Sequence, residues 1–328
     1  MTDILVSEAV RGAAIDALAD RWRLVEDLDA AGDPAVLAQY LPTIRAWIVR
    51  NRTQVTRDAI AAAPHLQIVA RAGVGLDNID CEAAEAAGIV VSFTPRENSV
   101  SVAELAIGMM IGWLRRLPEA DRHVRAGGWD RGRFMGGELA GRQLGLVGLG
   151  RIGLLVAERA RAFGMTIVGY DPCVRADDPR LAEQQIRWLP LEELLAGSDI
   201  VSCHVPLTPQ TRGLINDAFL SRMKPTALLV NTARGEIVDE AALIAALERQ
   251  RIGGAALDVR GEEPPKPGRL EEFPNVLLAP HIGAFTHEAQ QRVVAAVADD
   301  VARVLRGEPA RQAVARTRPG GNGPKGDR

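Results

Sequence analysis

Residues 144–153 constrain the fold of this chain more than any other stretch. An apolar run at 144–147 is typical of a buried strand, and a helical pattern follows at 154–163. The pattern Gly-x-Gly-x-x-Gly between a strand and a helix allows a tight turn, close approach of the backbone to a pyrophosphate, and close helix–strand packing. The sequence therefore predicts a dinucleotide-binding βαβ unit. Its glycines are Gly148, Gly150 and Gly153.

An acidic residue at the end of the next expected strand indicates which dinucleotide binds. That strand runs from Met165 to Tyr170 and is followed by Asp171. A carboxylate there can accept hydrogen bonds from both ribose hydroxyls of NAD, and it would repel the 2′-phosphate of NADP. We therefore expect NAD as the cofactor; the alternative is a glycine-rich turn with no ligand. The residues expected to face the phosphates are Gly148, Gly150, Arg151, Ile152 and Gly153, at the N-terminus of the helix.

The bulk composition excludes several classes of protein. A length of 328 residues suggests two domains, and a net charge of −3 gives no basic surface for nucleic acid. No apolar run approaches the roughly 20 residues of a membrane helix, and the N-terminus carries no export signal. The cysteines are far apart and odd in number, so neither a disulfide framework nor a metal site is implied. We expect a cytoplasmic protein.

Strand and helix signals alternate along the chain, which predicts an α/β fold with parallel sheets and helical crossovers. The first hundred residues form one expected unit, and the dinucleotide motif opens a second unit inserted into it. A final helix, Glu288 to Leu305, is expected to return to the first unit. We expect a ligand in a cleft between the units, outside the carboxyl ends of the strands. The expected boundaries are 1–98 for a substrate domain, 99–284 for the NAD domain, 285–311 for the returning helix, and 312–328 for a disordered tail.

A very apolar helix is expected from Val102 to about Leu117. Ser101 and Glu104 have the spacing of a capping box, which would start the helix there. Because the pattern is too apolar for a surface helix, we expect it to pack between domains or across a subunit interface.

Three expected strand ends carry residues suited to alcohol oxidation. Histidine is the natural proton carrier near neutral pH, and His281 directly follows a buried strand, with His204 as the second choice. Glu262 or Glu263, after another strand, could fix the imidazole tautomer. Arg234 also follows a strand, and its guanidinium can bind a carboxylate through two parallel N–H bonds. Structural ion pairs remain the alternative for each residue alone.

The motifs resemble those of the D-2-hydroxyacid dehydrogenases from about residue 4 to residue 307. The resemblance rests on six segments: Val-Gly-Leu-Gly-Arg-Ile-Gly (147–153), His-Val-Pro-Leu-Thr (204–208), Met-Lys-Pro (223–225), Val-Asn-Thr-Ala-Arg-Gly-Glu-Ile-Val-Asp-Glu (230–240), Ala-Leu-Asp-Val (256–259) and Pro-His-Ile-Gly (280–283). It implies a Rossmann NAD domain inserted into a flavodoxin-like substrate domain, and a homodimer formed largely through the NAD domains.

The resemblance also assigns roles to individual residues. The catalytic positions fall on Arg234, Glu263 (rather than Glu262) and His281. Backbone N–H groups of Val74 and Gly75 would hold the substrate carboxylate, which fits a glycine-rich anion nest. Asp258 would meet the nicotinamide carboxamide and Asp171 the adenosine ribose. The remaining residues expected at the cofactor are His204 and Thr232.

Two positions depart from the family pattern, and both bear on substrate preference. Arg260 stands where the family often has an aromatic residue, and Glu97 where glycine is common. The chain also ends before the regulatory domains of the longer phosphoglycerate dehydrogenases, so feedback control by serine is not expected.

The identity of the acid depends on Arg50, which closes a strand together with Arg52. If Arg50 faces the cleft, a substrate with a second anionic group is favoured, such as 3-phosphoglycerate or 3-sulfolactate. If it is a solvated loop charge, glycerate (as hydroxypyruvate in the reverse direction) or a small aliphatic hydroxy acid is favoured. Two other readings of the same fold are a non-catalytic NAD-responsive binding protein, as in the C-terminal-binding-protein family, and an enzyme of the same family that oxidises formate or phosphite.

Overall fold

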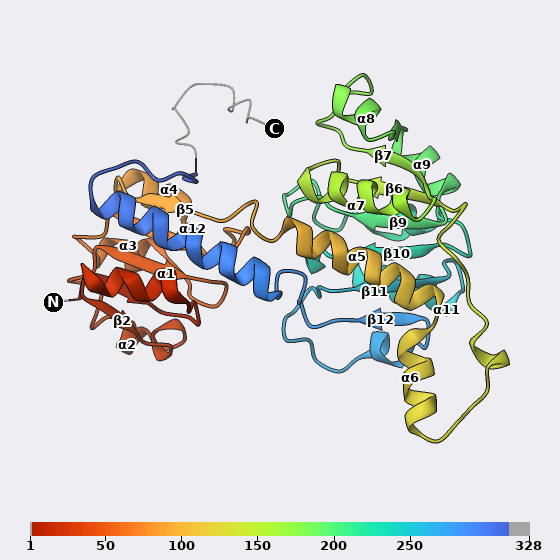
Figure 1. Ribbon diagram of the computed structural model, residues 1–328, viewed down its shortest axis with the longest axis horizontal. Coiled ribbons are helices and arrows are strands. Elements are labelled where there is room, and N and C mark those ends of the chain that lie inside the picture. Colours follow the sequence, from red (N-terminus) through yellow and green to blue (C-terminus); the bar gives the residue numbers. More distant parts are fainter. Residues whose placement is uncertain (1, 315–328) are drawn as a thin grey trace. The chain divides into compact units, whose positions relative to one another are not determined.

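The computed structural model describes residues 2–314, which divide into two compact units. Unit 2 is the continuous segment Ser99–Phe285, and unit 1 comprises the described residues before and after it (Figure 1). Within this described part, no helix combines the length and the apolar character that a membrane-spanning segment needs.

Unit 1 is built on a five-stranded sheet in which all strands are parallel. The order β2-β1-β3-β4-β5 is that of flavodoxin-like folds. Leu5 pairs with Trp47, and Trp47 with Val69, so fully buried side chains lie in register across the central strands. The strands are β1 (Ile4–Val6), β2 (Leu24–Glu26), β3 (Ala46–Val49), β4 (Ile68–Arg71) and β5 (Val90–Ser92).

Short helices connect these strands, and side-chain oxygens start several of them. Thr56 accepts the N–H of Ala59 at the start of α3, and Asp80 accepts that of Ala83 at the start of α4. These helices are α1 (Ala13–Asp16), α2 (Pro34–Leu37), α3 (Arg57–Ala61) and α4 (Cys81–Ala86), with 3₁₀ turns η1 (Ala17–Asp20) and η2 (Asp29–Ala31).

The last helix, α12 (His287–Leu305), completes unit 1 as expected. Thr286 caps its start by accepting the N–H of Ala289. Its apolar face, including Val297 and Val301, packs on the sheet residues Ile48 and Ile68. The first unit therefore depends on a segment from the far end of the chain.

The expected tail boundary at residue 312 is wrong for its first three residues. Ala313 forms an antiparallel bridge with Ser92, and the N–H of Val314 donates to Val91 O at 2.8 Å. The unpaired edge of β5 accounts for this pairing. Gln312 also donates to Glu97. Glu97, one of the two departures from the family pattern, therefore has a structural contact within unit 1. The rest of the expected tail, 315–328, lies outside the described residues.

Unit 2 contains a seven-stranded parallel sheet in the order β12-β11-β10-β9-β6-β7-β8. Renumbered from β6, this is the Rossmann order with one further strand, so the chain reverses its direction of winding between β6 and β9. The expectation of two doubly wound sheets is confirmed. The strands are β6 (Gln143–Val147), β7 (Thr166–Tyr170), β8 (Arg187–Trp188), β9 (Ile200–Cys203), β10 (Leu228–Asn231), β11 (Gly254–Leu257) and β12 (Val276–Leu278).

The apolar helix α5 (Ser99–Leu114) begins three residues before the expected start. Ser101 therefore lies inside the helix, and Glu104 pairs with Arg159 of α7 (Arg151–Ala162), so the expected capping box is wrong. Its apolar character is explained within unit 2, because Ala106 and Met110 pack in the core beside α7 and the sheet (Figure 1). The other helices are α6 (Leu117–Arg125), α8 (Pro179–Glu183), α9 (Leu191–Gly197), α10 (Asp217–Leu220) and α11 (Glu240–Glu248), with 3₁₀ turns η3 (Gly132–Phe134), η4 (Gly235–Ile237) and η5 (Arg269–Glu272).

Candidate active site

The glycine turn after β6 lies where the winding of the sheet reverses. Gly148 has a φ of 104°, and a Cβ there would lie 2.7 Å from the carbonyl carbon of His204, which follows β9. A Cβ on Gly153 would in turn strike the carbonyl of Gly148. Both glycines are therefore needed by the packing of the chain's own backbone.

Gly150 differs from these two because a Cβ there would meet no described atom within 4 Å. It is the N-cap of α7 and has no side chain to accept the helix's first N–H groups. The N–H groups of Arg151, Ile152 and Gly153 belong to the first turn, which has no intrahelical acceptors. An open surface beside the N-terminus of a helix, whose first amides have no acceptor within the helix, fits the pyrophosphate of a dinucleotide.

Asp171 stands at the end of β7, directly beside this turn. One oxygen accepts the N–H of Leu149 at 3.0 Å, and the other accepts that of Cys173 at 2.8 Å. Each carboxylate oxygen keeps a second lone pair, so the group can still accept both ribose hydroxyls. The geometry of Asp171 is thus compatible with the expected role at the adenosine ribose.

Two further expected cofactor residues lie at the ends of neighbouring strands. Thr232, after β10, is 8% exposed, and its hydroxyl has no hydrogen-bond partner among the described residues. A buried orphan hydroxyl is costly and fits a partner supplied by a ligand. Burial lowers the pKa of His204 to about 4, and its Nε2 lies 2.9 Å from Ser202 Oγ. So low a pKa makes this imidazole a weak base near pH 7, so His281 remains the preferred candidate for proton transfer.

The loop that carries His281 is held by Asp258, which follows β11. The two carboxylate oxygens accept the N–H groups of Ile282 and Gly283, each at 2.8 Å, and the backbone oxygen accepts that of His281. Burial raises the pKa of Asp258, although the two amides oppose that rise. His281 has a φ of 55°, a conformation that costs a non-glycine residue about 1–3 kcal/mol unless its surroundings impose it. Asp258 imposes it.

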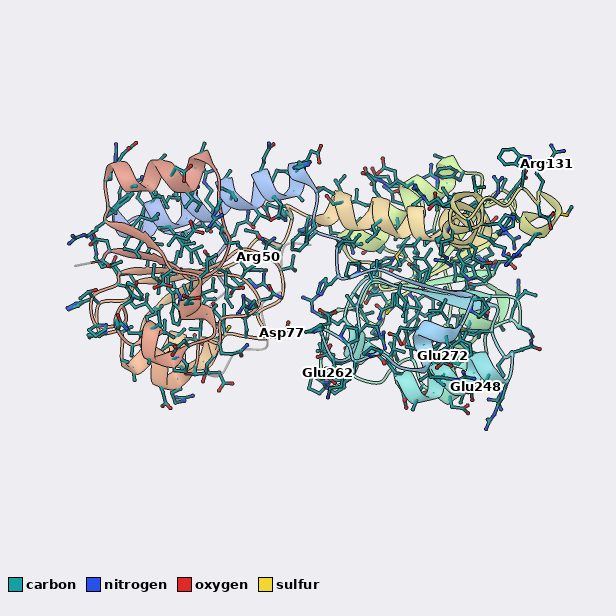
Figure 2. All side chains as sticks on the ribbon, turned by 90° about the horizontal axis from the view of Figure 1, so that it is seen from below. Arg50, Asp77, Arg131, Glu248, Glu262 and Glu272 are labelled. Atoms are coloured by element: carbon teal, nitrogen blue, oxygen red, sulfur yellow. The ribbon has the colours of Figure 1, made fainter. Side chains whose placement is uncertain are left out.

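His281 and Glu263 form the central contact of the candidate site. Glu263 Oε2 lies 2.6 Å from His281 Nδ1, and Oε1 accepts the N–H of Arg260 at 3.0 Å. Burial raises the pKa of Glu263, but the hydrogen bonds and the positive charge of Arg234 outweigh it, so the pKa is lowered overall. The carboxylate therefore engages Nδ1 of the ring and leaves Nε2 for proton transfer. Glu262, labelled in Figure 2, instead pairs with Lys266 in an exposed contact.

Arg234 lies in the loop after β10, close enough to influence the Glu263 charge. Asn231, fully buried at the end of the strand, shapes this loop by accepting the N–H of Ala233 and donating to Arg234 O at 2.9 Å. The Arg234 Nη1 donates to Ala233 O, which directs the guanidinium. Unit 2 thus gathers the expected arginine, glutamate and histidine at the carboxyl ends of β10, β11 and β12.

The expected substrate residues belong to unit 1, where they follow β3 and β4. Among the described residues, the N–H groups of Val74 and Gly75 donate to no acceptor, which fits an anion nest. The Arg50 guanidinium donates to Ala9 O at 3.2 Å and to Gln290 Oε1 at 2.5 Å (Figure 2). Asn78 links the two loops by donating to the carbonyls of Arg50 and Thr53.

Sequence reasoning missed two residues that shape the site. Asn231 precedes Thr232 in a recognised motif, yet its role appears only once the turn is folded. Arg260 was noted only as a departure, whereas its side chain is 11% exposed and paired with Glu240 and Glu271. The signal available in the sequence was a charged residue directly after a buried strand.

Comparisons with known proteins agree with this geometry. Residues 107–283 match the family described as D-isomer specific 2-hydroxyacid dehydrogenase, NAD binding domain. D-3-phosphoglycerate dehydrogenase of Synechocystis is 42% identical over 314 residues, which cover 96% of this chain and 56% of that protein. The chain therefore spans about half the length of this relative.

Two solved structures are similar over nearly their whole length. A glyoxylate reductase from Paecilomyes thermophila has a TM-score of 0.84 and 32% identity, covering 95% of this chain and 98% of that one. D-Lactate dehydrogenase from Aquifex aeolicus, in complex with NAD and lactic acid, has a TM-score of 0.82 and 29% identity, covering 93% and 96%. The chain belongs to the family of D-isomer-specific 2-hydroxyacid dehydrogenases, and unit 2 contains its NAD-binding domain.

Proposed function

We propose that this protein transfers hydride between a D-2-hydroxy acid and NAD, with the 2-oxo acid as the product of oxidation. The observation that carries the proposal is the 2.6 Å contact between His281 and Glu263. It lies beyond the carboxyl ends of the strands, as does the glycine turn. A proton carrier with a fixed tautomer beside a dinucleotide site is what alcohol oxidation requires.

The roles of the side chains follow from their contacts. His281 Nε2 takes the hydroxyl proton of the substrate, and Glu263 stabilises the imidazolium that forms. Arg234 binds the substrate carboxylate and orients C2. When bound, NAD accepts the hydride that leaves C2. In the reverse direction His281 returns the proton to the oxygen.

The N–H groups of Val74 and Gly75 also bind the substrate carboxylate in this proposal, since these two amides lack acceptors among the described residues. Arg50 remains the proposed recogniser of a second anionic group, in a substrate such as 3-phosphoglycerate or sulfolactate. Its guanidinium donates to two neutral acceptors, Ala9 O and Gln290 Oε1, and it also feels the negative charge of Glu8. The name of the Synechocystis relative supports the phosphorylated acid.

A homodimer in the cytoplasm completes the proposal. Large apolar side chains are exposed along 117–135, including Trp129 at 80% and Met135 at 84%, which favours burial against a second copy. The three cysteines are free thiols, which suits a reducing compartment.

The test compares kcat/KM for sulfolactate, 3-phosphoglycerate, glycerate and lactate with NAD. His281→Asn should lower turnover on the best of these by roughly a hundred- to ten-thousand-fold, the size of an acid–base contribution, with NADH affinity kept. Arg50→Met should lower kcat/KM for the two doubly anionic acids and spare lactate. A near-normal rate in His281→Asn would refute the mechanism, and NADH binding without turnover on any acid would favour a binding protein.

A further inference from the structure

The loop that carries Glu263 has little packing of its own. Residues 261–269 are all exposed, and the chain is buried again only at Leu270. Exposed loops of this kind fluctuate, because few apolar contacts hold them. Glu263 nevertheless meets His281 at 2.6 Å. Its position must therefore be fixed from a buried point near the loop's start.

Arg260, whose side chain is only 11% exposed, is that point. Its Nε and Nη2 donate to the two oxygens of Glu240, at 3.0 and 3.1 Å, and its Nη1 donates to Glu271 at 2.5 Å. Glu240 begins α11 and Glu271 lies in η5, so one guanidinium joins three segments. Glu240 also accepts the N–H of Gly261, and Glu271 that of Gly268. Both ends of the exposed loop are thus attached to one ion cluster.

The main chain of Arg260 contacts Glu263 directly, so the ion cluster is connected to the candidate site. Its N–H donates to Glu263 Oε1 at 3.0 Å, which leaves Oε2 for His281. On the other side, Gly235 packs so closely on the Arg260 carbonyl that a Cβ on Gly235 would strike it. Gly235 directly follows Arg234, so the loops of Arg234 and Glu263 meet at Arg260.

We propose that Arg260 is a positioning residue: its ion cluster with Glu240 and Glu271 fixes the backbone from which Glu263 orients His281. The inference rests on the proposed roles of Glu263 and His281. A lysine cannot reproduce it, because the three donor directions of the guanidinium are used on two carboxylates. An apolar residue would leave these two carboxylates close together without a cation.

The chain offers a matched control in Arg269. It joins the same two elements by pairing with Glu248 of α11 and Glu272 of η5, which lie close together in Figure 2. Among the described residues it forms no hydrogen bond or ion pair with Glu263, and its side chain is 51% exposed. Arg269→Ala therefore removes an ion pair between α11 and η5 without touching the proposed anchorage.

The experiment measures kcat, KM and NADH affinity for Arg260→Met, Arg260→Lys, Glu263→Gln and the double variant Arg260→Met/Glu263→Gln. The substrate is the best of the four hydroxy acids named above. Arg260→Met should lower kcat by about 10- to 100-fold, the cost of a misplaced catalytic group, with NADH affinity unchanged. Arg260→Lys should lower kcat less than Arg260→Met does. Arg269→Ala should stay within about twofold of the wild type.

The double variant separates positioning from general destabilisation. If Arg260 acts through Glu263, the double variant should match Glu263→Gln within about twofold, because the two changes remove one function. Additive losses would overturn the proposal, as would Arg260→Met behaving like Arg269→Ala. Should Arg260→Met not fold, the same comparison is made with Arg260→Lys. A fully active Glu263→Gln would instead refute the proposed acid–base site itself.

Discussion

At the scale of single residues, the glycines of the dinucleotide turn are required for two different reasons. Gly148 has a positive φ and no room for a Cβ beside the His204 backbone. Gly150 has room for a Cβ within the protein, so its requirement comes from the molecule that binds there. One motif thus combines a folding requirement with a binding requirement.

Alanine substitutions separate these requirements. Gly148→Ala should lower the free energy of unfolding by about 1–3 kcal/mol, because the backbone conformation and the close contact both resist a side chain. Gly150→Ala should unfold at the wild-type temperature yet bind NADH about tenfold more weakly, a loss of about 1.4 kcal/mol. Thermal unfolding without cofactor and fluorescence titration with NADH measure the two effects. Wild-type NADH affinity in Gly150→Ala would contradict this account.

Some site residues can be identified from the sequence alone, whereas the roles of others depend on contacts made only in the folded protein. Asp171, Arg234, Glu263 and His281 follow strands at motif spacings, and the contact between the last two is present as expected. The roles of Asp258 and Arg260 depend on partners that come together only in the folded unit, such as Glu271 for Arg260. Motif spacing predicts which strand a residue follows. It does not predict which of that residue's oxygen or nitrogen atoms form hydrogen bonds within the protein.

At the scale of elements, a buried carboxylate joins two strand ends of unit 1. Glu8, just after β1, is 5% exposed and accepts the N–H groups of all four residues 50–53 after β3. Burial raises the pKa of Glu8, but hydrogen bonds from the amides of Arg50, Arg52 and Thr53 and from the Thr53 hydroxyl outweigh it, so the pKa is lowered. Glu8 therefore shapes the loop that presents Arg50.

Glu8→Gln should lower the free energy of unfolding by about 2–4 kcal/mol, since a neutral amide oxygen cannot satisfy all these donors. Because the folded pKa is lowered, the contribution of Glu8 is complete above its unfolded pKa of about 4.3 and is lost as the pH falls through the folded pKa. The difference between wild type and Glu8→Gln should thus be constant above about pH 5 and shrink below it. Urea unfolding at several pH values measures this, with Glu82→Gln, at an exposed position of α4, as the control. A difference that does not change with pH would argue against the ionised clamp.

Element boundaries show where sequence reasoning stops. The strands at 4–6, 46–49, 200–203 and 254–257 coincide with largely apolar runs of the sequence. The start of α5 was misplaced because Ser99 and Ser101 are both plausible first residues, and the choice depends on Arg159, which takes Glu104 away from the helix start. The short strand β8 was missed because two residues give no periodicity.

At the scale of the whole molecule, each apolar core belongs to one unit. Two core clusters consist of residues of unit 2, from Ala103 to Leu270, and lie on the two faces of its sheet. The other two consist of residues of unit 1, and one of them depends on Val297 and Val301 of α12. Unit 2 is continuous in sequence, whereas unit 1 is assembled from two distant segments.

This arrangement predicts unequal behaviour of the two units when they are separated. A fragment of residues 99–285 should fold and bind NADH within about tenfold of the full chain, because it keeps its whole core, the glycine turn and Asp171. It should not oxidise hydroxy acids, since Val74 and Gly75 are missing. A fragment of residues 1–98 should not fold, because removing α12 exposes the apolar face around Ile48 and Ile68. Circular dichroism, NADH titration and activity assays measure these outcomes, and adding a peptide of residues 286–314 to the second fragment should restore its structure. Hydroxy-acid turnover by the first fragment alone would show that the substrate is held by unit 2, and the assignment of Val74 and Gly75 to its carboxylate would then be wrong.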